Sequence, residues 1–126
     1  MIQQQTVLKI ADNSGAKKVR CIKKLGEFKQ TNVKLGDIVL ISIFKLRNKS
    51  KKTSKVKKGL VLKALIIQTR RKTPKKDGST FFYKENIGCL INKRGKPLAT
   101  RILKPISKEL RKSKFMRFVN IAVGFI

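Results

Sequence analysis

Two apolar runs joined by a basic, turn-rich loop within residues 59–91 constrain the fold more than any other part of the chain. The first run, residues 59–69, is rich in aliphatic residues and too short for a stable isolated helix, so it favours a buried β-strand. Pro74 and Gly78 predict turns, because proline presets φ and glycine accepts positive φ. The second apolar run resumes at Phe81. We therefore expect two strands that hold a cationic loop out into solvent.

Other segments carry further strand signals. We expect short strands at residues 6–10, 16–24, 38–44 and 98–103, each bordered by turn residues. The imperfect alternation in residues 16–24 places Val19, Cys21 and Lys23 on one face. Residues 45–58 are dense in lysine and contain no acid, which predicts an extended loop or mobile hairpin.

A helical element is expected after Pro105. Ser107 suits the N-cap, and Glu109 lies in the first turn, where the helix dipole favours an acid. The apolar side of this element would contain Leu110, Phe115, Met116 and Val119. About five or six short strands with one helical tail predict a mainly β fold, a small β-barrel. With 126 residues, we expect one domain, with the barrel over residues 1–104 and the helical element over residues 105–120.

The charge of the chain points to a polyanionic partner. Thirty-three Lys and Arg face six Asp and Glu, a formal net charge of +27 at pH 7. Self-repulsion on this scale destabilises an isolated compact chain, and binding a polyanion relieves it. Lysine and arginine neutralise phosphates and release counterions, so nucleic acid is the expected partner. The residues expected to bind RNA are Lys17, Lys18, Lys45, Arg47, Lys49, Lys51, Lys52, Lys55, Lys57, Lys58, Arg70, Arg71, Lys72, Lys75, Lys76, Lys93 and Arg94.

A membrane surface is the other polyanion, and the sequence disfavours it. Surface binding uses an amphipathic basic helix, whereas the cations here lie mostly in turn-rich stretches. The uncharged apolar residues 118–126 are far shorter than the roughly 20 residues of a membrane span. Residues 1–6 resemble neither a secretory signal nor a transit peptide, so we expect the protein to work where it is made.

The aromatic residues bear on the kind of RNA that is bound. Phe81, Phe82 and Tyr83 would form a stacking platform for single-stranded RNA if they were exposed. Aromatic residues of strands normally pack, so we expect at least two of the three in the core. A protein that recognises the shape of folded RNA therefore fits the sequence better than a single-strand binder.

The residues needed for catalysis are missing from the sequence. There is no histidine, and Asp12, Asp37 and Asp77 lie in turns where each has a structural role. Cys21 and Cys89 could form one disulfide, but we expect both to be reduced and buried in apolar strands. Two cysteines without histidine fall short of the about four ligands of a structural zinc site. We expect no enzymatic activity, no metal and no cofactor.

A series of motifs runs in order from residue 1 to about Val119. They are MIQQQT at residues 1–6, ADNSGA at 11–16, LGDI at 35–38, KVKKG at 55–59, LKA at 62–64, TRI at 100–102, KELR at 108–111 and KFM at 114–116. A central signature of Ala with three aliphatic residues, a basic spacer, Asp-Gly, an aromatic and Asn stands at residues 64–67, Asp77, Gly78, Tyr83 and Asn86. These motifs resemble the family of the universal fourteenth protein of the large ribosomal subunit.

The resemblance implies a five-stranded β-barrel with a basic loop extension and a short C-terminal helical element, docked on large-subunit rRNA. It also implies a place at the intersubunit face, a bridge to small-subunit rRNA, and large-subunit proteins three and nineteen as neighbours. A ribosome-silencing factor would dock on the C-terminal face, which by this carry-over includes Thr100, Arg101, Lys108 and Lys114. The rival hypotheses are a free RNA-binding regulator or chaperone with a similar barrel, and a cationic membrane-active protein.

Departures from the family pattern bear on location. Cys89 stands where the family usually has valine, residues 47–55 look longer and more basic than in bacteria, and residues 121–126 lack the usual Ala-Pro ending. The composition leans on Lys, Ile, Asn and Phe without Trp or His, as expected of an A+T-rich gene. Together with the absence of a presequence, these features predict a mitochondrially encoded protein of the mitochondrial large subunit. The alternative is the cytoplasm of a bacterium with an A+T-rich genome.

Overall fold

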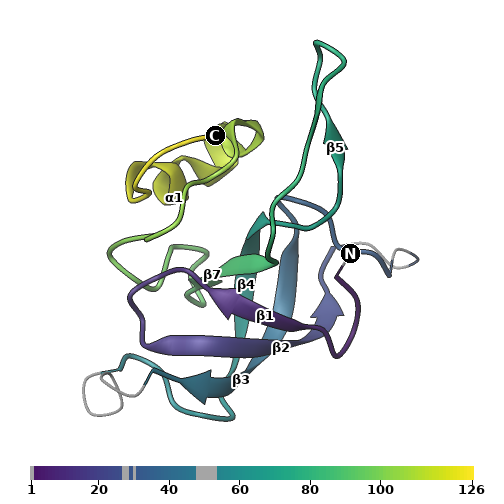
Figure 1. Cartoon of the computed structure of the whole chain (residues 1–126). Helices are drawn as coiled ribbons and strands as arrows, with labels where there is room; N and C mark the ends of the chain where they lie inside the picture. Colours follow the sequence, from purple (N-terminus) through teal and green to yellow (C-terminus); the bar gives the residue numbers. More distant parts are fainter. Residues whose placement is uncertain (1, 27–28, 30, 48–53) are drawn as a thin grey trace.

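The structure, a computed structural model, describes residues 2–26, 29, 31–47 and 54–126. Its strands close a barrel in the order β1-β2-β3-β4-β7 (Figure 1). Neighbouring strands are antiparallel, except that β1 and β7 pair in parallel and close the barrel. The mainly β barrel predicted from the sequence is therefore confirmed. The barrel strands are β1 (Val7–Ile10), β2 (Ala16–Lys24), β3 (Ile38–Leu46), β4 (Val61–Gln68) and β7 (Ile87–Ile91).

Two apolar clusters lie on opposite sides of the barrel wall. The inner cluster includes Leu8, Ile41 and Ile66, which point into the barrel from alternate strand positions. The outer cluster joins Leu65 of β4 and Cys89 of β7 to side chains of the C-terminal segment. Strands β4 and β7 are thus covered on both faces, which is why their sequences are continuous apolar runs rather than alternating ones.

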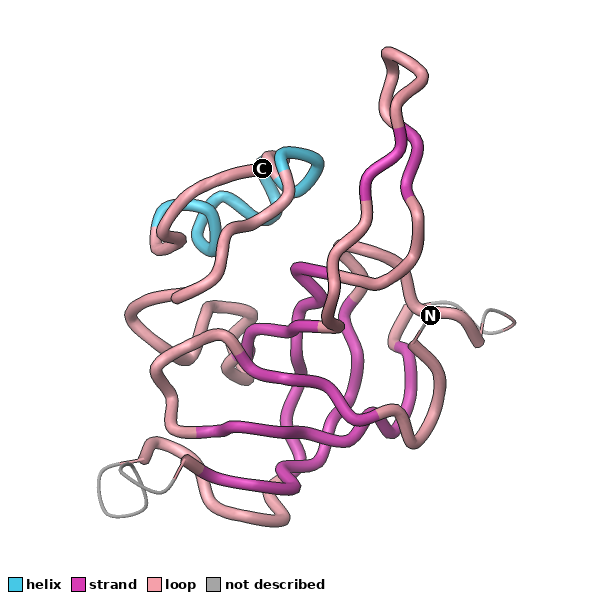
Figure 2. The backbone as a smooth tube through the Cα atoms, viewed as in Figure 1, coloured by secondary structure: helices cyan, strands magenta, loops and turns pink. Residues whose placement is uncertain are grey.

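The C-terminal segment that covers β4 and β7 consists of short helical turns rather than one helix (Figures 1 and 2). Two 3₁₀ turns, η2 (Lys108–Leu110) and η3 (Ser113–Phe115), lead into α1 (Met116–Asn120). The N-cap prediction for Ser107 is confirmed, because its hydroxyl accepts a hydrogen bond from the backbone N–H of Glu109 at 3.4 Å.

The predicted apolar side of this segment is right at three positions and wrong at one. Leu110, Phe115 and Val119 are buried, but Met116 is 39% exposed. Phe118, which the sequence interpretation passed over, is buried instead. Helix α1 begins directly after η3, with Phe115 as its N-cap. Phe115 and Phe118 are three residues apart and therefore lie on the same, inward face.

The last residues pair with the chain that precedes η2, an arrangement that the sequence did not predict. Parallel bridges join Ile102 to Ala122 and Ile106 to Phe125. The backbone N–H of Lys108 donates to the carbonyl of Ile126 at 3.0 Å. Residues 121–126 are therefore tied to the barrel's outer cover.

The strand expected at residues 98–103 is wrong. Within these residues only Ile102 forms β-bridges, to Asp12 and to Ala122, and Pro97 just before them bridges to Ile91. Between these bridges, Oδ1 of Asn13 accepts hydrogen bonds from the backbone N–H groups of Thr100 (3.1 Å) and Arg101 (3.3 Å). A side chain thus takes the place of a neighbouring strand as hydrogen-bond partner.

Strand β2 reverses its faces near its end. Val19 and Cys21 are buried as expected, but Lys24 is buried in place of Lys23. The pairing register with β3 shifts between Cys21 and Lys23, as happens at a β-bulge, and the next side chain turns inward. Its ammonium Nζ lies 3.0 Å from the carboxylate of Asp37, so this charge is buried as an ion pair.

Both cysteines are free and buried, as the sequence predicts. Burial raises the pKa of the Cys21 thiol. Burial also raises the pKa of Cys89 well above its ordinary value, and the neighbouring carboxylate of Asp12 raises it further. Since the thiolate is the reactive species, neither side chain is suited to reaction in the folded protein.

We expect the folded protein to resist alkylation at both cysteines. Iodoacetamide at about pH 8, near the ordinary thiol pKa, should add no label in native buffer and two labels in denaturant. Intact mass spectrometry counts the labels directly. Rapid labelling of Cys89 in native buffer would contradict its burial.

Candidate nucleic-acid interface

A two-stranded hairpin carries the predicted cationic loop away from the barrel (Figures 1 and 2). Strand β5 (Thr73–Pro74) pairs with β6 (Thr80–Phe81). Pro74 therefore lies in a strand rather than in a turn, which contradicts our expectation. Proline is tolerated because a two-stranded ribbon leaves the outer edge of each strand unpaired. The turn itself is formed by residues 75–78, where the N–H of Gly78 donates to the carbonyl of Lys75 at 3.2 Å.

Hydrogen bonds at the base of this hairpin fix its direction. The backbone N–H of Arg70 donates to Oδ1 of Asn86 at 2.9 Å, and Nε of Arg70 donates to the carbonyl of Lys84 at 2.7 Å. The N–H of Tyr83 donates to the carbonyl of Thr69 at 3.2 Å. An anchored hairpin thus presents five predicted RNA contacts, all exposed: Arg70, Arg71, Lys72, Lys75 and Lys76.

The expectation that the nearby aromatic residues pack in the core is wrong. Phe82 is 60% exposed, and Phe81 and Tyr83 are only half-buried. The strand expected to continue from Phe81 is two separate elements, β6 and β7, and β6 belongs to a ribbon with no second layer to cover it. Phe81 instead packs edge-on against Tyr83, with ring centroids 5.8 Å apart. The ring of Phe82 is therefore exposed enough to stack on a base, contrary to the expectation from the sequence.

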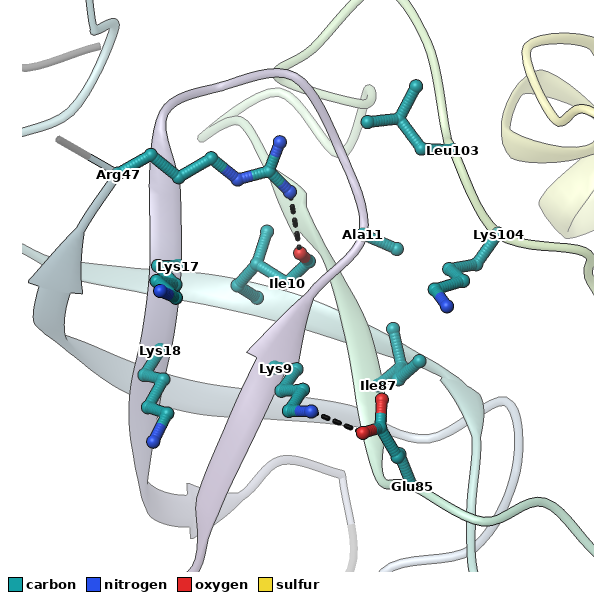
Figure 3. A pocket seen from close by; sticks show the side chains of 10 residues that line it. All are labelled: Lys9, Ile10, Ala11, Lys17, Lys18, Arg47, Glu85, Ile87, Leu103 and Lys104. Carbon is teal, nitrogen blue, oxygen red and sulfur yellow. Dashed lines mark hydrogen bonds and ion pairs between the residues drawn. The ribbon is translucent and has the colours of Figure 1, made fainter. Parts of the chain in front are cut away.

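A pocket of about 760 Å³ lies on the barrel side where β1, β2 and the end of β3 meet residues 103–104 (Figure 3). It brings together three predicted contacts, Lys17, Lys18 and Arg47, with Lys9 and Lys104. The sequence interpretation missed the last two. The sequence indicates Lys9 only by its outward position in the alternation of β1, and nothing in it indicates Lys104. The pocket forms because strands distant in sequence pair with each other.

Two polar contacts shape this pocket (Figure 3). Nη2 of Arg47 donates a hydrogen bond to the backbone carbonyl of Ile10 at 3.2 Å, which fixes the guanidinium at the pocket's edge. Lys9 forms an ion pair with Glu85, and hydrogen bonding from Lys9 lowers the pKa of that carboxyl group. Glu85 is therefore anionic at neutral pH and offsets one cation of the pocket.

The long basic segment after β3 departs from the expected extended loop in the parts that the structure describes. Lys45 belongs to β3, which continues to Leu46. Val56 is buried, and the N–H of Gly59 donates to the carbonyl of Ile43 at 2.8 Å, so the returning chain packs on the barrel. Around this anchor, Lys55, Lys57 and Lys58 are exposed. The predicted contacts Lys49, Lys51 and Lys52 lie outside the described residues.

A second groove, of about 510 Å³, is lined by some of the remaining predicted residues but not by others. Lys93, predicted to bind RNA, and Lys114, predicted to face a protein partner, both line it. Arg94 is exposed on the same turn as Lys93. By contrast, Thr100 and Arg101 form hydrogen bonds with the side chain of Asn13, and Lys108 is the first residue of η2. Lys114 therefore shares its surroundings with a predicted RNA contact.

In the part of the chain that the structure describes, no helix is both long and apolar enough to cross a bilayer.

Comparison with protein families identifies the chain. The family model described as Ribosomal protein L14p/L23e matches residues 1–126, the whole length of the sequence. The chain belongs to the L14p/L23e family. L14p/L23e proteins are structural components of the large ribosomal subunit and not enzymes, so this chain is a ribosome-associated structural protein. The resemblance noted in the sequence motifs is thereby confirmed.

Proposed function

We propose that this L14p/L23e protein binds large-subunit rRNA through the β5–β6 hairpin and the cations around the barrel. The observation that carries the proposal is the anchored hairpin with five exposed cations on a chain of formal charge +27. Rigid presentation favours contacts with phosphates of folded RNA, because little ordering of the protein is needed on binding. The proposed contacts also include Lys17, Lys18, Lys45, Arg47, Lys49, Lys51, Lys52, Lys55, Lys57, Lys58, Lys93 and Arg94.

The same proposal extends to the intersubunit face, with a bridge to small-subunit rRNA and large-subunit proteins three and nineteen as neighbours. A ribosome-silencing factor would use Thr100, Arg101, Lys108 and Lys114. Exposed apolar side chains in the C-terminal segment support a protein contact there, since Val123 is 73% and Ile126 is 51% exposed. We treat residues 1–126 as one functional unit, because the C-terminal segment shares its apolar cluster with β4 and β7.

For location, we propose the mitochondrial large subunit, with the protein encoded inside the organelle. The support is compositional, namely the weight of Lys, Ile, Asn and Phe and the absence of Trp and His. The cytoplasm of a bacterium with an A+T-rich genome is the alternative.

One experiment tests both proposals. New protein is labelled in cells while cytosolic translation is blocked, and the mitochondrial lysate is sedimented through a sucrose gradient. We expect labelled chain in the large-subunit fraction. Loss of labelling under the block refutes organellar encoding, while labelled chain confined to the light fractions refutes the ribosomal assignment and favours a free RNA-binding regulator.

A further inference from the structure

The pocket between β1, β2 and residues 103–104 combines two kinds of surface (Figure 3). Its floor is apolar: Ile10 and Ala11 are each 4% exposed and Ile87 is 2% exposed, so their carbon atoms are fixed by the core behind them. Leu103 adds a side chain that is 49% exposed. A leucine left half in water beside a concave apolar floor suits a flat, carbon-rich group that slides in against it.

The rim of the same pocket is cationic. Five cations and one carboxylate line it, a net charge of +4 from 5 − 1. The carboxylate is Glu85, which Lys9 already engages. Lys17, Lys18 and Lys104 supply ammonium groups, and Arg47 supplies a guanidinium held by the carbonyl of Ile10. Such a rim attracts an anion, and phosphate matches both ammonium and guanidinium donors.

We infer that this pocket binds one nucleoside monophosphate unit, with its base against the apolar floor and its phosphate at the cationic rim. Inorganic phosphate alone would leave the floor and Leu103 uncovered. A continuous duplex presents its phosphates on a convex surface and keeps its bases stacked, so it cannot fill a concave site of about 760 Å³. A single unstacked nucleotide offers both surfaces together, and a pocket of this size falls in the range of small-molecule sites.

Such a unit has two sources: an unstacked nucleotide of RNA, or a free nucleotide. The RNA source rests on the proposed rRNA binding, and it extends that proposal from phosphate contacts to recognition of an extruded base. Two sets of probes separate the sources. The first is an RNA duplex with one bulged adenosine, compared with the same duplex carrying an abasic bulge. The second is AMP alone, compared with ribose 5-phosphate.

The test uses the full chain and two matched variants. Leu103→Ser removes the exposed apolar wall of the pocket, and Leu60→Ser removes a leucine of similar exposure (42%) that does not line it. We expect the unmodified chain to bind the bulged adenosine duplex about tenfold more tightly than the abasic one, the effect of burying roughly 60 Å² of ring face. Leu103→Ser should abolish this preference, and Leu60→Ser should retain it.

Each outcome decides the matter. AMP is titrated while the NMR signals of the backbone amides are followed. If the amides of Ala11 and Lys17 shift saturably but the bulged adenosine is not preferred, the pocket is a site for free nucleotides. Neither preference nor AMP shifts overturns the inference, while rRNA binding through the hairpin would stand. If the unmodified chain binds no rRNA, the proposed function fails instead, and the AMP measurements still decide the pocket.

Discussion

Glutamine in place of all five hairpin cations, Arg70, Arg71, Lys72, Lys75 and Lys76, is expected to cause the largest loss of rRNA affinity. Each phosphate contact contributes about 0.9 to the slope of log affinity against log salt, so the slope should flatten by about 4. Raising the salt from about 50 to 200 mM should therefore weaken the unmodified chain roughly 300-fold more than the variant. Filter binding between about 50 and 200 mM salt measures both quantities. Single replacements should have small effects, because the remaining cations keep the RNA engaged.

The matched control for the hairpin changes the same charge elsewhere. Five exposed cations of the C-terminal segment are replaced with glutamine: Lys108, Arg111, Lys112, Lys114 and Arg117. This variant should lose much less affinity, since its cations lie on the outer cover of the barrel and not on the projecting hairpin. An unchanged slope in the hairpin variant, or equal losses in both variants, would show that the hairpin is not the main contact.

The second large effect concerns stability, and it comes from Asp12→Ala. Asp12 is fully buried, and its side chain accepts hydrogen bonds from the backbone N–H groups of Leu90 at 2.9 Å and Ser14 at 3.1 Å. It also accepts from the Ser14 hydroxyl. Because β1 ends at Ile10, this carboxyl group continues the pairing of β7 where the strand has stopped.

Removing that acceptor leaves buried donors without partners. Each costs about 1–3 kcal/mol, so Asp12→Ala should lower the free energy of unfolding by roughly 3–5 kcal/mol. Native domains have about 5–15 kcal/mol in total, so the variant should lose a large share of its stability. Urea unfolding followed by circular dichroism gives the change as a shift in midpoint at constant slope.

The chain contains its own control for this prediction. At the tip of the hairpin, Oδ1 of Asp77 accepts hydrogen bonds from the N–H of Ser79 at 3.0 Å and from its hydroxyl at 2.6 Å. The arrangement repeats that of Asp12 and Ser14, but Asp77 is exposed. Asp77→Ala should therefore leave the urea midpoint nearly unchanged, because water replaces the lost acceptor. Similar losses in the two variants would show that burial is not what makes Asp12 important.

The strands of the barrel were predictable because burial leaves a local trace in the sequence. The continuous run at residues 64–67 reports a strand covered on both faces, and the alternation at Val19 and Cys21 reports one covered on a single face. This local signal is missing where the burial of a side chain depends on a part of the chain that is distant in sequence. Phe82 has the sequence of a core aromatic but lies on a ribbon that no second layer covers. The bulge that turns Lys24 inward likewise depends on pairing with β3.

The candidate site shows the same difference between residues that are close and residues that are distant in sequence. The hairpin cations are neighbours in sequence, so charge density alone located them. The pocket takes Lys9 from β1, Lys17 from β2, Arg47 from beyond β3 and Lys104 from the C-terminal half. No local pattern links these residues, because the pairing of β1 with β7 and the path of residues 103–104 bring them together. Charge density in the sequence therefore predicts the hairpin as an RNA contact, while the proposed nucleotide pocket could be recognised only from the fold.

The parallel pairing of β1 with β7 has a consequence for biosynthesis. Lys9 lies opposite Ile87, so the first strand to leave the translating ribosome completes its pairing only after most of the chain has been made. Until then the sheet of β1 to β4 has an open edge, and the outer face of β4 awaits residues 102–126. Open edges and uncovered apolar faces promote self-association. High like charge opposes it, so the cations proposed to bind RNA in the finished protein would also keep incomplete chains apart.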